Sequence, residues 1–266
     1  MKPRHQWEKV AAAPVPSPPA LAVVDSAAGR ETRLEELGER VRECRRCRLG
    51  KTRTNVVFGS GSASARLMLV GEAPGYHEDQ LGLPFVGHAG KLLEKLLGRI
   101  GLKREDVFIA NVLKCRPPGN RDPQPEEISL CRSFLEEQID IICPLAVCTL
   151  GNFATKLISG KPDGITRVRG KTQPLPGKED TVLFPMFHPA AALYTPANLK
   201  VLERDFDNLG KIIGISPGVE DSQKPQAGIE ATHIKNSESQ VLLEVNAETP
   251  VKPSESQVEP EQLGLF

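Results

Sequence analysis

The sequence predicts an α/β protein, a three-layer α/β/α sandwich around a four-stranded parallel sheet. Two observations lead to this prediction. Four short apolar runs of strand length recur along the middle of the chain, and segments with helical periodicity alternate with them. Such alternation is typical of a parallel sheet with right-handed crossovers and helices on both faces.

The first half of the expected domain contains two strands and two helices. RLMLVG (66–71) is an apolar run that glycine ends, and HAGKLLEKLLGRIG (88–101) has leucines at helical spacing with Gly101 as a C-cap. VFIANVLK (107–114) is the second expected strand. PEEISLCRSFLEEQIDII (125–142) begins with proline and two glutamates, which favour a helix N-terminus, so we expect a helix over this range.

The second half repeats the pattern. LAVCTLG (145–151) is the third expected strand, and NFATKLIS (152–159) is a short helix. TVLFPMFHP (181–189) is the fourth strand, and ANLKVLERDFDNLGKII (197–213) is the closing helix. The pattern by itself indicates only a generic doubly wound enzyme fold.

Composition divides the chain into three parts. Residues 1–30 form an Ala/Pro-rich leader that we expect to be disordered, and 31–214 form the folded domain. Residues 215–266 are rich in Ser, Pro, Glu and Gln and are expected to be a disordered acidic tail. Lys plus Arg and Asp plus Glu both number 34, but the tail has a net charge of −6 and the domain +4. A mildly basic domain is compatible with a nucleic-acid partner.

Nothing in the sequence predicts a membrane segment, because no apolar run reaches 18 residues. We therefore expect a cytoplasmic protein. As separate expectations, the protein is nucleoid-associated and a monomer. Cysteines stay reduced in that compartment, so closely spaced pairs indicate metal or redox chemistry before disulfides.

One such pair lies in RECRRCRLGKTR (42–53), where two residues separate Cys44 from Cys47 among five arginines and a lysine. Cationic neighbours favour the thiolate, which binds metals and attacks electrophiles. The pair could be half of a metal site, a redox couple, or two ordinary cysteines at the end of a helix.

Polar groups gather just past the expected strands. In open parallel sheets, ligands bind outside the carboxyl ends of the strands. The residues at that edge are Glu72, Glu78, Asp79, Asn111 and His188. Each of them alone has an ordinary structural explanation, and their shared placement is what favours a functional site.

These motifs together resemble the family 4 uracil-DNA glycosylases, the iron–sulfur type. The resemblance runs from about residue 36 to 213, and we expect a bacterial member of the family. It rests on GEAPG (71–75), PFVGHAG (84–90), NVLKCRPPGNR (111–121) and HPAAAL (188–193), together with Cys44, Cys47, Cys115 and Cys131. It implies the uracil-DNA glycosylase fold, uracil-containing DNA as substrate, and release of uracil to leave an abasic site.

The resemblance also bears on the cysteines. It implies that Cys44, Cys47, Cys115 and Cys131 hold a [4Fe–4S] cluster. From the residues alone, four thiolates suit either zinc or an iron–sulfur cluster. The other two cysteines, Cys143 and Cys148, lie in or beside an apolar run, so we expect them in the core.

The resemblance assigns roles to the residues that line the pocket. His188 matches the histidine that donates a hydrogen bond to uracil O2, Asn111 matches the asparagine that reads the base, and Phe85 matches the aromatic that stacks on it. The turn at Glu72, Ala73 and Gly75 is expected to line the pocket with backbone N–H groups.

The water-activating group is left open. Family 1 glycosylases have an aspartate where this chain has Ala73, so Glu72 and Glu78 are the candidates for that role. For DNA binding, Lys114, Arg116 and Arg121 look suited to phosphates, and Leu193 is the candidate wedge into the duplex.

The chain ends in EPEQLGLF, an apolar end on an acidic tail. Gln262, Leu263, Leu265 and Phe266 resemble the short peptide by which bacterial proteins bind the DNA polymerase sliding clamp. Two other functions stay open at this point: a non-catalytic module that binds lesions, and an iron–sulfur redox sensor.

Overall fold

The computed structural model describes residues 26–215, which lie within the first of two units, Met1–Glu220 and Asp221–Phe266. The predicted disordered leader and tail therefore fall largely outside the described residues. The structure begins earlier than the predicted boundary of the domain, since helix α1 (Ala27–Arg42) starts with the Ser26 side chain accepting a hydrogen bond from Gly29 N.

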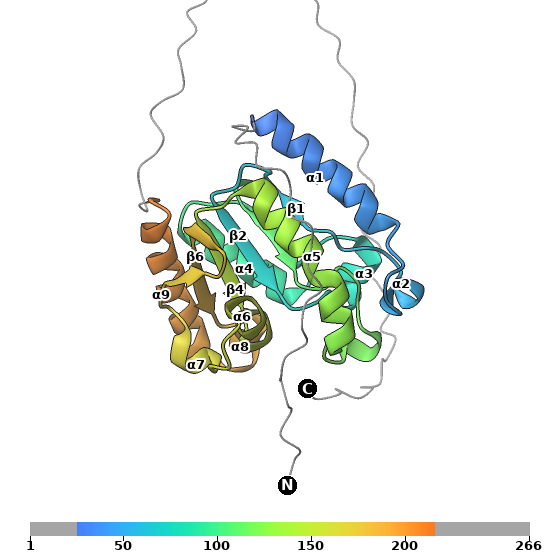
Figure 1. The fold of residues 1–266 in the computed structure, drawn as a ribbon. Helices are drawn as coiled ribbons and strands as arrows, with labels where there is room; N and C mark the ends of the chain where they lie inside the picture. Colours follow the sequence, from blue (N-terminus) through green and yellow to red (C-terminus); the bar gives the residue numbers. More distant parts are fainter. Residues whose placement is uncertain (1–25, 216–266) are drawn as a thin grey trace, which may run out of the picture. The chain divides into compact units, whose positions relative to one another are not determined.

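A six-stranded sheet forms the middle layer, in the order β1-β3-β2-β4-β6-β5 (Figure 1). Its four central strands are parallel: β2 (Leu67–Gly71), β3 (Phe108–Asn111), β4 (Ala146–Leu150) and β6 (Lys178–Met186). The predicted α/β sandwich and its four parallel strands are confirmed. The strand number differs, because β1 (Ser60–Gly61) and β5 (Gln173–Leu175) add antiparallel edges.

Helices cover both faces of the sheet (Figure 1). One face packs against α1, α5 (Pro125–Ile142) and α6 (Asn152–Ser159). The other packs against α4 (His88–Arg99) and α9 (Ala197–Ile212). Side chains of β2 alternate between the two hydrophobic clusters, with Met68 and Val70 on one side and Leu67 and Leu69 on the other. Both faces are therefore buried, as in other parallel sheets.

Short elements complete the loops around the sheet. They are the helices α2 (Leu49–Thr52), α3 (Tyr76–Leu81), α7 (Ile165–Val168) and α8 (Ala190–Tyr194), with 3-10 turns η1 (Arg104–Asp106) and η2 (Pro118–Asn120). Among the described helices, none is long and apolar enough to cross a membrane.

The last strand is shifted toward the N-terminus by three residues relative to its predicted range, 181–189. Strand β6 begins at Lys178 because it pairs with β5 through a turn at Gly177, whose φ is +75°. It ends at Met186, so Phe187, His188 and Pro189 leave the sheet. This early exit places His188 beyond the carboxyl end of the strand.

The prediction that Cys143 lies in the core is wrong, whereas Cys148 in β4 is fully buried. Cys143 is exposed because α5 ends there: the residue is in the left-handed region, with a φ of 48°, and the strand begins only at Ala146. Its thiol donates a hydrogen bond to Asp140 O at 2.9 Å.

Candidate functional site

The carboxyl ends of the parallel strands carry a cluster of three side chains, Phe85, Asn111 and His188. Asn111 is the last residue of β3, His188 follows β6, and Phe85 lies in the loop between α3 and α4. Gly71, at the end of β2, is the point where two of them meet. A Cβ atom at Gly71 would lie 2.4 Å from Asn111 Oδ1 and 2.8 Å from the Phe85 ring. Only glycine permits this close approach.

His188 is held as a neutral hydrogen-bond donor. Its Nδ1 accepts a hydrogen bond from Ala190 N at 3.1 Å, so the neutral ring carries its proton on Nε2. Burial lowers the pKa of His188 to about 4, and the charge of Glu78 opposes that shift only in part. At neutral pH the imidazole is therefore uncharged, with Nε2–H available as a donor.

Phe85 is buried, and its ring stacks on the imidazole of His188, with centroids 5.5 Å apart and an interplanar angle of 25°. Its backbone is in the left-handed region, with a φ of 53°, which is costly for a bulky residue. Arg104 holds this conformation by donating to Phe85 O at 2.8 Å and to Pro84 O. Gly90 allows it, since a Cβ there would be 1.8 Å from Phe85 O.

Asn111 is 3% exposed, and within the described part of the chain its carboxamide makes no hydrogen bond. Because no fully buried side-chain polar atom of the described residues lacks a partner, the polar atoms of this carboxamide are accessible to water or to a ligand. The backbone is fixed instead, because Lys114 Nζ donates to Asn111 O at 2.9 Å. The carboxamide is thus positioned and free to bind.

The acidic residues at this edge divide into two kinds. Glu78 Oε1 accepts hydrogen bonds from Val86 N and Gly87 N at 3.0 and 3.2 Å, and buried Asp79 accepts from Thr54 N and Asn55 N. Both carboxylates therefore hold neighbouring loops in place.

Glu72 belongs to the second kind: no described residue hydrogen-bonds its carboxylate. Burial, and then the nearby charge of Asp122, raise the pKa of Glu72 to about 7. Such a carboxyl titrates in the range where a general base is useful. The two other residues of this turn lie close by: Ala73 packs against the core, and Gly75 directly precedes α3.

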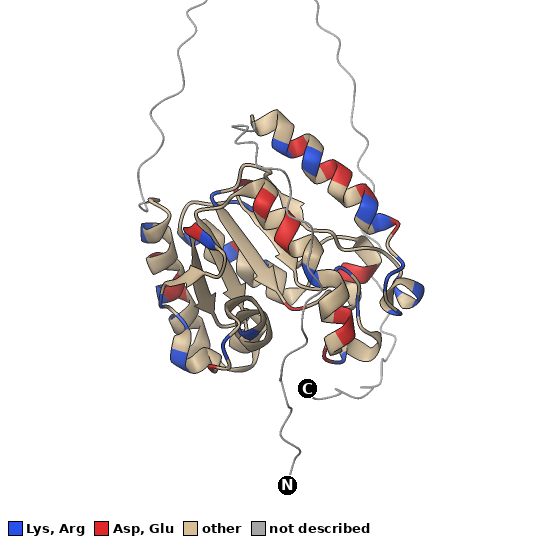
Figure 2. Ribbon diagram, in the orientation of Figure 1, with Lys and Arg blue, Asp and Glu red and all other residues tan. Residues whose placement is uncertain are grey.

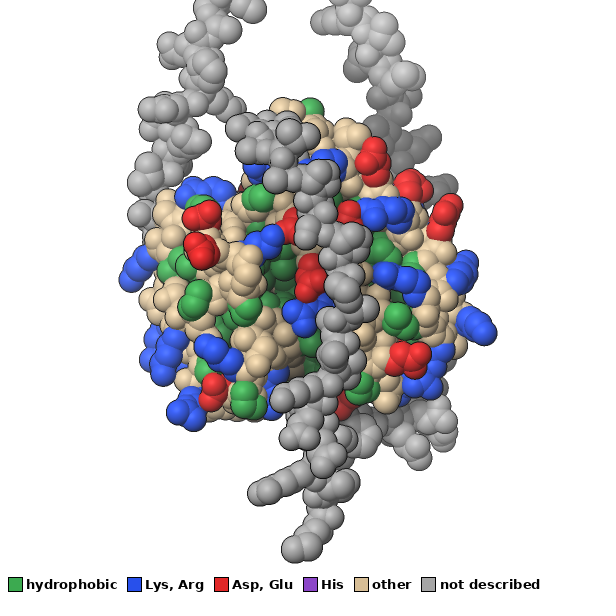
Figure 3. Space-filling model, in the orientation of Figure 1, with side chains coloured by type: hydrophobic (Ala, Val, Ile, Leu, Met, Phe, Trp, Pro, Cys, Tyr) green, Lys and Arg blue, Asp and Glu red, His purple; other side chains and the backbone are tan. Residues whose placement is uncertain are grey.

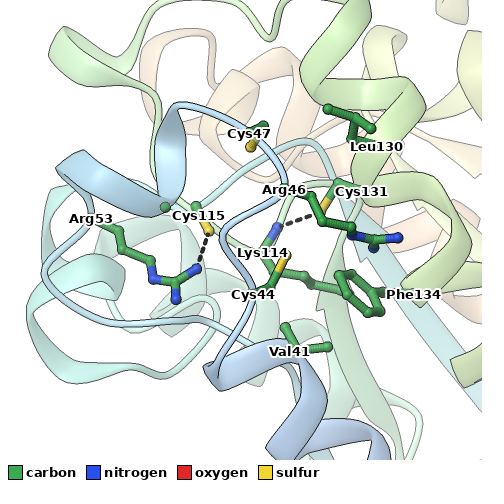
Figure 4. Close-up of a pocket in the computed structure, with 11 residues that line it drawn as sticks. Val41, Cys44, Arg46, Cys47, Arg53, Lys114, Cys115, Leu130, Cys131 and Phe134 are labelled. Carbon is green, nitrogen blue, oxygen red and sulfur yellow. Dashed lines mark hydrogen bonds between the residues drawn. The ribbon is translucent and has the colours of Figure 1, made fainter.

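The four cysteines of the predicted metal site line one pocket. Cys44 and Cys47 come from the segment after α1, Cys115 from the loop after β3 and Cys131 from α5, and Figure 4 shows all four directed toward the same space. Arg53 donates to Cys115 Sγ at 3.1 Å. Burial raises the pKa of Cys131 to about 11 and that of Cys115 in the same direction.

In the range that the structure describes, no group of three or more His, Cys, Asp or Glu is placed to hold a metal ion. The four thiols nevertheless line one pocket, and four thiolates are a donor set that suits either zinc or an iron–sulfur cluster.

The prediction that Lys114 contacts DNA phosphates is wrong. Lys114 is 1% exposed, and its Nζ donates to Asn111 O and, at 2.6 Å, to Gln138 Oε1. A buried ammonium needs such partners. Lys114 lies in the loop after β3, where the sequence shows only a basic residue close to other basic residues.

The other predicted DNA contacts are at the surface. Arg116 lies over the ring of exposed Tyr76 at 5.2 Å and donates to Asn120 Oδ1. Arg121 is 32% exposed and pairs with the buried carboxylate of Glu127, which Arg48 also contacts. Leu193 in α8 is 47% exposed and its neighbour Tyr194 is 83% exposed.

Basic side chains are also found along the segment from the end of α1 to α2 (Figure 2). On the face shown in Figure 3, Lys and Arg side chains spread over both sides and alternate with acidic ones. On this face the basic side chains therefore form no single block of like charge.

Sequence reasoning missed the residues that support the His188 loop. Arg169 pairs with Asp205 of α9, which is 1% exposed, and its guanidinium lies 5.4 Å from the ring centroid of Phe187. Gly170, with a φ of +69°, lies against the same carboxylate. No sequence pattern joins residue 169 to residue 205, although an Arg-Gly pair before a strand is a turn signal.

Comparison with known proteins was consistent with this geometry. Residues 58–209 match the family model of the Uracil DNA glycosylase superfamily. The chain is 49% identical to the Type-4 uracil-DNA glycosylase of Sulfurisphaera tokodaii, over 67% of this chain and 84% of that protein. It is 47% identical to the one of Archaeoglobus fulgidus, over 68% and 95%, and 46% identical to the one of Thermotoga maritima, over 64% and 88%.

Proposed function

The chain belongs to the Uracil DNA glycosylase superfamily, and on that premise we propose that it is a type-4 uracil-DNA glycosylase. It hydrolyses the N-glycosidic bond of uracil in DNA and leaves an abasic site, the first step of base excision repair. The observation that supports this proposal most strongly is the cluster of Phe85, Asn111 and His188, in which the first two meet at Gly71 and the imidazole stacks on the Phe85 ring.

Recognition of the base follows from these three side chains. The enzyme must extrude the nucleotide from the stack, at a cost of a few kcal/mol. Phe85 would stack on the extruded base. The unpartnered carboxamide of Asn111 can accept from N3–H and donate to O4, which is the edge of uracil and the reverse of the pattern on cytosine.

Bond cleavage follows from His188. As the glycosidic bond breaks, the sugar becomes oxocarbenium-like and electron density builds on the departing base. The Nε2–H of neutral His188 would donate a hydrogen bond to uracil O2 as that charge develops. Since the donor is uncharged and fixed by Ala190 N, it needs no reorganisation during the reaction.

Of the two candidates for activating the attacking water, Glu72 is better placed than Glu78. The hydrogen bonds of Glu78 to Val86 N and Gly87 N favour a role in shaping the loop, whereas Glu72 has a raised pKa and an unpartnered carboxylate. We assign Glu72 to the activation of water, with Ala73 and Gly75 forming the turn beside it. On the DNA side, Leu193 would enter the duplex, and Arg116 and Arg121 would lie near phosphates.

We further propose that Cys44, Cys47, Cys115 and Cys131 hold a [4Fe–4S] cluster. The donor set fits, because four thiols from three separate segments line one pocket. These four cysteines would hold the group through iron–sulfur bonds, and so join the segment after α1, the loop after β3 and helix α5. Binding and positioning of the base are the work of Phe85, Asn111 and His188.

The tail carries a separate proposal. Gln262, Leu263, Leu265 and Phe266 lie outside the described residues, and their pattern supports binding to the DNA polymerase sliding clamp of a bacterium. A tail at 215–266 would then tether the domain at 31–214 near newly made DNA, in the cytoplasm with the nucleoid. Residues 1–30 take no part in this proposal, and the enzyme would act as a monomer.

A product assay tests the proposed function. An oligonucleotide with one uracil should yield free uracil and one alkali-labile site at that position. The same sequence with cytosine or thymine there should yield neither. Tight binding of uracil-containing DNA without release of uracil would instead indicate a lesion-binding module, and a cluster that responds to oxidants without any release would indicate a redox sensor.

A further inference from the structure

One buried lysine contacts both the cysteine pocket and the candidate base-reading residue. Lys114 is 1% exposed and directly precedes Cys115. Its backbone N–H donates to Cys131 Sγ at 3.4 Å, as Figure 4 shows. Its Nζ, at the other end of the side chain, donates to Asn111 O at 2.9 Å.

The ammonium is fixed by a second chain of hydrogen bonds. Gln138 Oε1 accepts from Lys114 Nζ at 2.6 Å, and Gln138 Nε2 donates to Phe58 O at 2.9 Å. Gln138 is fully buried in α5. These bonds hold the ammonium in one position. A buried cation held in this way interacts strongly with nearby charges, because the surrounding protein screens them less than water does.

The pocket that Lys114 lines contains several other side chains that can carry charge. The described residues that line the same pocket include four thiols and, besides Lys114, the cations Arg46 and Arg53. Arg46 lies over the Phe134 ring at 3.9 Å, and Arg53 donates to Cys115 Sγ. Lys114 differs from both, because it is buried and its Nζ donates to Asn111 O at 2.9 Å.

We propose that Lys114 is a positioning residue that couples the two sites: its ammonium balances the charge of the cluster thiolates and at the same time fixes the backbone of Asn111 for base recognition. The proposal rests on the proposed cluster and glycosylase activity. It reassigns a residue that sequence alone placed on DNA phosphates.

Two effects should follow from Lys114→Met, which removes the ammonium but keeps the backbone N–H bond to Cys131. The reduction potential of the cluster should become more negative, because a nearby positive charge favours the added electron. The single-turnover rate of uracil release should fall by about 10–100-fold, the usual cost of losing a supporting partner of a site.

A double-mutant cycle separates positioning from general destabilisation. If Lys114 acts through Asn111, Lys114→Met should cost little once Asn111→Ala is present, whereas independent effects multiply. Lys95→Met, at an exposed lysine of α4, is the control and should change neither the potential nor the rate. Iron content and melting temperature are measured on every variant.

Gln138→Leu tests the proposal if Lys114→Met fails to fold. This variant keeps the ammonium but removes one of the two acceptors of Lys114 Nζ. The reduction potential of the cluster should therefore stay unchanged while the rate of uracil release falls. The loss of rate should not add to that of Asn111→Ala. The proposal is overturned if the potential of Lys114→Met equals that of Lys95→Met, or if its rate loss is fully additive. A wild type that carries the cluster but releases no uracil would sink the proposed function alone, since the potential still reports on Lys114.

Discussion

A single glycine sets the geometry of the base-reading pair. Asn111 Oδ1 and the Phe85 ring both occupy the space in which any other residue at Gly71 would place its Cβ. Phe85 reaches this space only through a left-handed backbone that Arg104 and Gly90 hold in place. Strain of this kind is typical of functional sites, where the surrounding structure fixes a costly conformation.

At the same scale, Glu72 gives a pH prediction. If its carboxylate activates water, the single-turnover rate of the wild type should rise with pH through an inflection near 7 and level off above it. Glu72→Gln should lose the inflection and at least about 100-fold in rate at pH 8. A variant that keeps the inflection would remove Glu72 from this role.

The same shift of the Glu72 pKa has an effect on stability with a definite sign. Its pKa in the folded protein lies above the ordinary 4.5, so between that value and about 7 the folded state binds more protons than the unfolded state. The free energy of unfolding should therefore fall as pH rises through this window. Glu72→Gln should raise the melting temperature relative to wild type more at pH 8 than at pH 5.

Helices and strands were predictable to the extent that their own residues specify them. α5 begins at Pro125 and ends at Ile142 as expected, since proline and two glutamates favour its start and Gln124 N donates to Glu127. β1 and β5 have two and three residues, and only pairing with a neighbour makes them strands. No local sequence pattern predicts edge strands as short as these.

Helix α1, unlike the two edge strands, has a helical pattern in its own sequence. Leu34, Leu37 and Val41 are spaced three and four apart and are buried against the core. The Ala/Pro-rich composition of the preceding residues drew the expected boundary too far into the helix. Arg30, inside the predicted leader, in fact donates to Ile142 O of α5.

The cysteines give a prediction at the scale of elements, since their pocket joins the end of α1, the loop after β3 and α5. Cys131→Ala should lose iron, visible colour and thermal stability together. Cys143→Ala is the matched control: this thiol is exposed at the end of the same helix and should leave all three unchanged. Iron bound at the wild-type ratio in Cys131→Ala would contradict the assigned ligands.

Helix α8 gives a second prediction. Leu193 is 47% exposed on a short helix that directly follows His188, and an exposed apolar side chain at this place suits insertion between base steps. Leu193→Ala should slow uracil release from duplex DNA more than from single-stranded DNA, because only the duplex must be opened. Leu145→Ala, similarly exposed at the opposite end of the sheet, should slow neither.

For the whole molecule, the parallel sheet is what made the site predictable. Residues far apart in sequence meet because four strands end at one edge, so the strand pattern of the sequence is enough to group Asn111 with His188. The direction in which each side chain points was not predictable from the sequence. Lys114 and Arg121 both follow β3, yet Lys114 points into the core and Arg121 pairs with buried Glu127. Tertiary packing decides the direction of each side chain.

The tail gives the prediction for the full chain. Deleting residues 262–266 should abolish binding to a bacterial sliding clamp in a pull-down and leave uracil release from free oligonucleotides unchanged. Replacing Leu265 and Phe266 with Ala should have the same effect, whereas Gln257→Ala, outside the motif, should have none. Clamp binding that survives the deletion would exclude this peptide.

The most direct test of the account is the single-turnover rate of uracil release by His188→Ala, measured beside the wild type on a single-uracil oligonucleotide. Loss of one donor aimed at developing charge typically costs about 10²–10³ in rate. We expect that loss with DNA affinity largely kept, because His188 acts on the departing base and the backbone contacts lie elsewhere. A His188→Ala enzyme that releases uracil at the wild-type rate would contradict the account.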